Sequence, residues 1–288
     1  MQKRTRIWLG IGSAVLVGGA ATAGLDRDDG LLVPKALAQS HAGHMMLVQG
    51  GEGGEGGEGG EGGGAATTDE ESVLEPDQAL ASDLLLMKGH YRVGDRLVRA
   101  GRWSEALPHF LHPIEELYPN VREILAERDQ PPFGDALDQL ARLVRRQADL
   151  AAYEKQLQEV QGRIDAALAT VPAEKRGSAT FVGSVAVSLL DTAAEEYANA
   201  FDEEGKLVNV VEYQDSMGFV EEAADLLGKH ADAFKSSGNA QRYAEIERSL
   251  AELRKAWPDV TPPKKPVMQP GEVLAGVSNI ELAASGLR

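Results

Sequence analysis

The chain of 288 residues contains no cysteine. This excludes disulfide frameworks, thiolate metal sites, iron-sulfur clusters, attached c-type haem and a cysteine nucleophile. Aromatic residues make up only 5% of the chain, and the recurrent Ala, Leu, Glu and Gln favour helices over strands. Basic residues are also few, with 29 Lys and Arg against 45 Asp and Glu, a formal net charge of -16. Because proteins bind nucleic acid through basic side chains, we expect no nucleic-acid partner.

The N-terminus has the pattern of an export signal. Basic residues precede an uncharged apolar run over residues 7–23, and the small residues at its end predict a signal peptide over residues 1–23, cleaved after Ala23. Cleavage after Ala38 and an uncleaved anchor are alternatives, because the 17 residues of the run are at the lower limit for spanning a bilayer. Each alternative predicts an exported, periplasmic protein with no other membrane insertion.

Residues 24–75 are expected to form a disordered spacer. Residues 50–64 contain only Gly and Glu, so they have nothing apolar to bury and much backbone entropy to lose on ordering. Just before them stand two imidazoles and two thioethers, ligand types that copper accepts: His41, His44, Met45 and Met46. These four are either incidental to an unstructured tail or a metal-binding segment.

Between residues 76 and 257, apolar residues recur at intervals of three and four, which predicts amphipathic helices. Short connections rich in Gly or Pro predict about six helices in an antiparallel up-and-down bundle. The second helix should be kinked by its prolines, and the third should run unbroken from after Pro132 to about Val171. Five prolines predict that residues 258–288 are extended or disordered. The expected fold class is all-α.

Three histidines in the helical region fall within 23 residues: His90, His109 and His112. His90 shares a helix face with apolar residues, whereas His109, His112 and Glu115 are spaced by three and share one side of the next helix. An imidazole and a carboxylate at this spacing can hold a metal ion, as the Glu-x-x-His pairs of di-iron bundles do in the reverse order. A hydrogen bond between His90 and Glu115 without metal is the alternative.

Two acids on a later helix, Glu212 and Asp215, flank the apolar face that carries Tyr213. They could complete a metal site between helices or accept hydrogen bonds from its histidines. The alternative is a pair of solvated acids beside a core tyrosine whose hydroxyl finds a partner.

An exported, cysteine-free, helical chain with His112-x-x-Glu115 on an early helix resembles the imelysin-like family, which includes periplasmic components of bacterial iron uptake. The resemblance implies a helical bundle and a metal site at the His-x-x-Glu motif, which falls here on His112 and Glu115. This chain has Phe110 where the family has Gly, and Pro113 lies inside the motif.

These features together predict a periplasmic, non-enzymatic protein that binds a transition metal for uptake or handling. Imidazole and carboxylate suit iron, copper and zinc, and iron is our first expectation. Expected partners are the metal ion and an envelope protein. The alternative function is an envelope adaptor, built from tetratricopeptide-like hairpins, that binds a peptide or polysaccharide. A carboxylate-bridged oxidase would need about four carboxylates and two histidines facing inward, and the third and sixth predicted helices offer few such acids.

Overall fold

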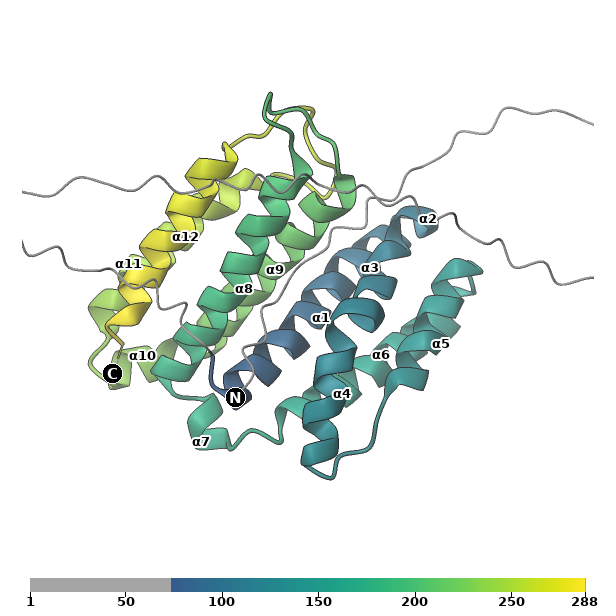
Figure 1. Cartoon of the computed structure of the whole chain (residues 1–288), viewed down its shortest axis with the longest axis horizontal. Coiled ribbons are helices and arrows are strands. Elements are labelled where there is room, and N and C mark those ends of the chain that lie inside the picture. Colours follow the sequence, from purple (N-terminus) through teal and green to yellow (C-terminus); the bar gives the residue numbers. More distant parts are fainter. Residues whose placement is uncertain (1–73, 288) are drawn as a thin grey trace, which may run out of the picture. The chain divides into compact units, whose positions relative to one another are not determined.

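The computed structural model describes residues 74–287 of the chain (Figure 1). Within that range every named element is a helix. One isolated antiparallel β-bridge joins Phe201 and Leu207 in a connection between helices. The all-α helical bundle is therefore confirmed. The predicted signal peptide, the predicted spacer as far as residue 73 and its group of His and Met residues lie outside the described residues.

The first part of the described chain is built around the long helix α1. Pro76 stands in its first turn, and the Gln78 side chain accepts a hydrogen bond from the backbone N–H of Glu75 at 3.0 Å in a capping box. The chain turns just after the helix at Gly101, which has a φ of 75°. The elements here are α1 Pro76–Arg99, α2 Trp103–Ala106, α3 Pro108–His112, η1 Pro113–Leu117, α4 Tyr118–Glu127, α5 Gly134–Arg145, α6 Leu150–Leu168 and α7 Ala173–Arg176.

Prolines divide the predicted second helix more thoroughly than a kink would. Pro108, Pro113 and Pro119 each stand at the start of a separate segment, α3, η1 and α4 respectively. A proline there loses no hydrogen bond, because the first N–H groups of a helix have no partner within it. The segment that Pro113 opens, η1, is a turn of π-helix, a feature often found at functional sites.

The predicted unbroken third helix is wrong. The structure has two helices, α5 and α6, joined by a turn in which Gln147 has a φ of 50°. The Asp149 side chain then accepts a hydrogen bond from the backbone N–H of Ala152 and caps α6. The apolar residues keep the same spacing on both sides of the break, because each of the two helices buries one face.

The second part of the described chain is a four-helix bundle of α8, α9, α11 and α12. Helix α8 packs against α9 and α12, and α11 packs against α12. Helix α1 lies against α8 and α9 on one side and against α3, η1 and α4 on another, so it joins the two parts (Figure 1). The elements are α8 Ala179–Ala200, α9 Val210–Lys229, α10 Ala231–Ser236, α11 Ala240–Leu253, η2 Arg254–Ala256 and α12 Pro270–Ser285.

The prediction that residues 258–288 are extended or disordered is wrong for most of that segment, because residues 270–285 form α12. The last proline of the segment, Pro270, opens the helix, and Gln269 and Glu272 form a capping box. Val273, Val277 and Ile280 bury one stripe against the rest of the bundle. A dense run of prolines therefore marked a connection and a helix start rather than a tail.

Helices α1 and α9 cross at very short range. Gly89 and Gly218 face each other there, and a Cβ atom added to Gly89 would lie 2.7 Å from the ring of Phe219. Only glycine allows so close an approach of two helix backbones. None of the helices within residues 74–287 combines the length and the apolar character that crossing a bilayer requires.

Candidate metal centre

Asp215 on α9 lies at the centre of a cluster of histidines. The Nδ1–H groups of His90 and His109 each donate to Oδ1 of Asp215 at 2.6 Å. Nδ1 of His112 lies 3.1 Å from the other carboxylate oxygen, Oδ2. Because His90 is on α1 and the other two rings are on α3, three helices meet at this carboxylate. The structure thus brings together the three predicted histidines and one predicted acid.

His109 orients the carboxylate and has no ring nitrogen left over. Its Nδ1 bonds to Asp215, and its Nε2 lies 3.0 Å from Oε1 of Gln214. The Gln214 amide is fixed in turn, since its Nε2 donates to the backbone oxygen of Val260 at 3.0 Å. His109 is therefore a positioning residue that holds Asp215 in place, in the way that partners behind a ligand commonly do.

His90 has an unused ring nitrogen. Its side chain is only 3% exposed, and Nε2 has no hydrogen-bond partner within the described residues. Buried polar atoms without partners are rare in native proteins and often indicate a missing ion or water. The His90 ring is perpendicular to that of His112, with centroids 5.6 Å apart. One ligand atom from each of His90, His112 and Asp215 lies within 4.8 Å of the others.

Electrostatics separate the roles of the cluster's members. Burial opposes ionisation of Asp215, but the neighbouring rings of His90 and His109 hold its pKa well below the ordinary value. Burial lowers the pKa of His90, although the charge and the hydrogen bond of Asp215 oppose this shift. Burial also opposes charge on His112, yet the hydrogen bond and charge of Asp215 outweigh it and raise the pKa of His112 to about 9. His112 is therefore cationic at pH 7.

Three further carboxyl groups lie around His112 and Asp215, and two of them were not predicted. Glu116 on η1 and Glu212 on α9 both contribute to the raised pKa of His112. Glu196 on α8 is hydrogen-bonded to Glu212, and burial together with this neighbour raises the pKa of Glu196 far above its ordinary value. Burial likewise raises the pKa of Glu116. Asp215 and these three acids, from η1, α8 and α9, therefore interact electrostatically.

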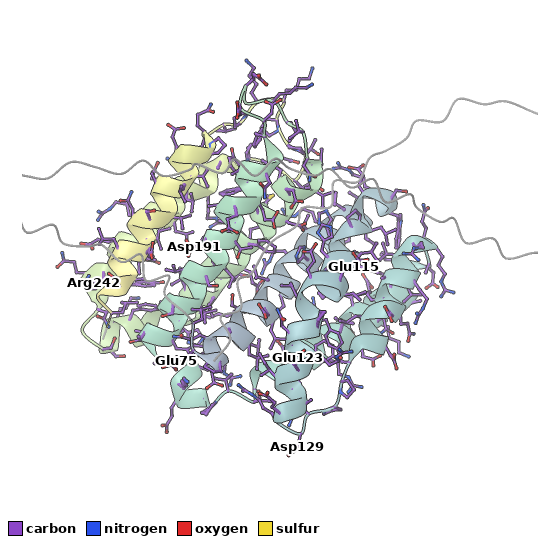
Figure 2. All side chains as sticks on the ribbon, viewed as in Figure 1. Glu75, Glu115, Glu123, Asp129, Asp191 and Arg242 are labelled. Atoms are coloured by element: carbon purple, nitrogen blue, oxygen red, sulfur yellow. The ribbon has the colours of Figure 1, made fainter. Side chains whose placement is uncertain are left out.

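The acid of the predicted His-x-x-Glu motif lies outside this cluster. Glu115 is exposed on η1, where Figure 2 labels it, and the ion pair of His112 is with Asp215 instead. Glu116 is the η1 acid whose charge acts on His112. A π turn contains more residues than an α turn, so a spacing of four rather than three brings an acid beneath His112. The sequence analysis did not predict this π turn, which begins at Pro113.

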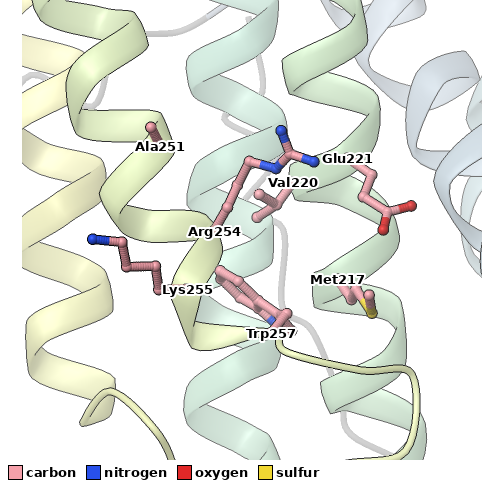
Figure 3. Close-up of a pocket in the computed structure, with 7 residues that line it drawn as sticks. All are labelled: Met217, Val220, Glu221, Ala251, Arg254, Lys255 and Trp257. Atoms are coloured by element: carbon pink, nitrogen blue, oxygen red, sulfur yellow. The ribbon is translucent and has the colours of Figure 1, made fainter.

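A separate pocket of about 340 Å³ opens between α9 and the end of α11 (Figure 3). Met217, Val220 and Glu221 line it from α9, on the side of that helix opposite Asp215 at 3.6 residues per turn. Trp257 lines it as well, and its indole N–H donates to Oγ of Ser216 at 2.7 Å. The pocket is therefore distinct from the histidine cluster.

Comparison with known proteins identifies one similarity. Residues 172–287 match the family described as the iron permease-associated 4-helix bundle domain. No curated protein and no solved structure matches the chain. The matched segment contains α8, α9, α11 and α12, the four helices that form the bundle in the structure.

The match supports an iron-related helical bundle and does not extend to the imelysin-like family suggested by the motif. A permease-associated domain is a transport component, which agrees with the prediction of a non-enzymatic protein. The matched segment contains only part of the candidate centre. Glu196, Glu212 and Asp215 lie within the matched residues, whereas His90, His109 and His112 come from the preceding helices.

Proposed function

We propose that this protein is an exported, periplasmic iron-binding component of a metal-uptake system, which holds the ion at His90, His112 and Asp215 and hands it on without chemical conversion. The observation that carries the proposal is that His90, His112 and Asp215 each place one ligand atom within 4.8 Å of the others. The buried Nε2 of His90, which has no hydrogen-bond partner among the described residues, supports it. The match of the C-terminal bundle to an iron permease-associated domain supports iron as the cargo.

The residues present fit a divalent transition metal. Two imidazoles and a carboxylate suit iron, and they suit zinc and copper as well. The carboxylate is ionised because its pKa is well below the ordinary value, so it can act as a ligand at pH 7. His109 and Gln214 hold it from behind, which fixes the direction in which its oxygens point.

The electric field around His112 favours a cation. Asp215, Glu116 and Glu212 raise the pKa of His112 to about 9, which means that these acids already hold one positive charge in the form of a proton. A metal ion would displace that proton and experience the same acids. Its binding should therefore strengthen as the pH rises toward 9.

The proposal is tested by metal content. The mature protein is purified from a periplasm without chelators, beside a His90→Ala, His112→Ala double variant and a His230→Ala control whose histidine lies between α9 and α10. We expect iron in the wild type and in His230→Ala and almost none in the double variant. Equal iron in all three proteins would refute the proposal.

A further inference from the structure

We propose that the pocket between α9 and the end of α11 binds a small organic carboxylate, whose anion pairs with Arg254 and whose apolar body lies on Trp257. The pocket is separate from the candidate metal centre, so this inference does not depend on the proposed function. Its volume of about 340 Å³ is at the small end of the range for sites that bind small organic molecules.

The floor of the pocket is apolar and fixed in place. Met217, Val220 and Trp257 line it, with exposed fractions of 8%, 2% and 6%. The indole N–H of Trp257 donates to Oγ of Ser216 at 2.7 Å, and the ring makes an edge contact with Tyr197 at 5.0 Å between centroids. Because its N–H is engaged inside the protein, Trp257 offers the pocket only apolar ring surface. Such a preformed surface has little conformational entropy to lose when a ligand binds.

The rim of the pocket is basic on the side of α11. Arg254 and Lys255 are exposed there, and within residues 74–287 the Arg254 guanidinium forms no ion pair or hydrogen bond. Lys255 pairs with Glu252 at 2.5 Å, but these side chains are 63% and 67% exposed, so the pair contributes little. Basic side chains stabilise the C-terminus of a helix, but that role does not require an apolar surface beside them.

The acid on the other side of the rim is already neutralised. Nη2 of Arg96 donates to both carboxylate oxygens of Glu221, at 3.0 and 2.8 Å. Figure 3 shows this carboxylate turned away from Arg254. The lining residues therefore leave a positive charge without a partner, although the chain as a whole has a net charge of -16. This local charge favours an anionic ligand.

A carboxylate on a flat apolar body matches the floor and the rim together. The planar fork of a guanidinium can bind both oxygens of a carboxylate, so Arg254 would hold the anion. The body would then cover Trp257 beside Met217 and Val220. An inorganic anion has no such body, and an uncharged ring has no partner for Arg254. Tight binding therefore requires both parts in one molecule.

Isothermal titration calorimetry with benzoate, benzamide and acetate tests the inference. Benzamide has the ring without the charge, and acetate has the charge without the ring. The protein is kept free of metal, because a carboxylate could otherwise bind the ion itself. We expect benzoate to bind at least about tenfold more tightly than either of the others. The indole N–H resonance of Trp257, assigned by its loss in Trp257→Phe, should shift as benzoate binds.

Variants of α11 and its end place the ligand in the pocket. Arg254→Gln should weaken benzoate binding about tenfold, and Ala251→Phe should abolish it by filling the pocket from an exposed position. The matched control is Arg248→Gln, which removes the same charge from an exposed residue of α11 outside the lining, and it should keep wild-type affinity. No binding of benzoate to the wild type, equal binding of benzamide, or unchanged affinity in Arg254→Gln and Ala251→Phe would overturn the inference.

Discussion

The backbone of Gly218 on α9 lies directly against that of Gly89 on α1, so that a Cβ atom at Gly218 would overlap the Gly89 carbonyl. Gly89 precedes His90, and Gly218 lies three residues after Asp215. The close crossing of the two helices is what allows His90 to reach Asp215 at 2.6 Å. Two residues with no side chains thus set the spacing of the candidate centre.

Replacing Gly218 by Ala should therefore both destabilise the protein and weaken metal binding. The added methyl group must separate α1 from α9, and such overpacking typically costs about 1–3 kcal/mol. Chemical denaturation and a metal titration would measure the two effects. Gly228→Ala is the matched control on α9, because no atom lies within 4 Å of a Cβ there. It should stabilise the helix by up to about 1 kcal/mol and leave metal affinity unchanged.

The two acids of η1, Glu115 and Glu116, should contribute differently to metal affinity. Glu116→Gln removes a charge that acts on His112, and we expect metal affinity to fall roughly fivefold to tenfold, equivalent to about 1 kcal/mol. Glu115→Gln makes the same substitution at the neighbouring exposed residue and should change metal affinity little. Isothermal titration calorimetry of both variants checks this, and the reverse ranking would favour the His-x-x-Glu motif.

The stability of the metal-free protein should depend on pH through His112. Its pKa rises from 6.5 to about 9 on folding, so its contribution is fully present below pH 6.5 and is lost as the pH rises through 9. The shift corresponds to about 3 kcal/mol. Urea denaturation of wild type and His112→Gln, with chelator present, should show a difference that shrinks between pH 6.5 and 9.5. A difference that stays constant over this range would contradict the assigned ion pair.

Asp191 should be a destabilising residue at neutral pH. Burial, with the charges of Glu281 and Glu195, raises the pKa of Asp191 to about 6. Its ionised form therefore destabilises the folded state above pH 6, and the penalty disappears below the unfolded value near 4. Asp191→Asn should gain about 1 kcal/mol at pH 7.5, after allowance for solvent screening, and nothing at pH 4. Thermal melts at the two pH values measure the difference.

Much of the fold follows from local patterns in the sequence. Apolar spacing predicted the helical class, because a helix such as α1, with 24 residues, must bury a continuous apolar stripe. Periodicity could not show the break between α5 and α6, since both helices keep the same spacing. The Pro-rich run after Trp257 hid α12, because prolines suit a helix start as well as an extended chain.

The candidate centre was predictable only in part. His90, His109 and His112 stood out because histidines are few and these lie close together in the sequence, and Asp215 flanked an apolar face. Glu116 was missed because the π turn at Pro113 changes the spacing. Glu196 was missed because its role depends on the packing of α8 against α9, which no local pattern specifies.

X-ray absorption at the iron K-edge tests most directly whether His90, His112 and Asp215 bind the metal. Full-length protein loaded with one equivalent of Fe(II) should show nitrogen and oxygen neighbours together with the outer-shell scattering of imidazole rings. In His90→Ala the imidazole scattering should fall markedly. Iron surrounded by oxygen alone, with a spectrum that His90→Ala and His112→Ala leave unchanged, would contradict the account.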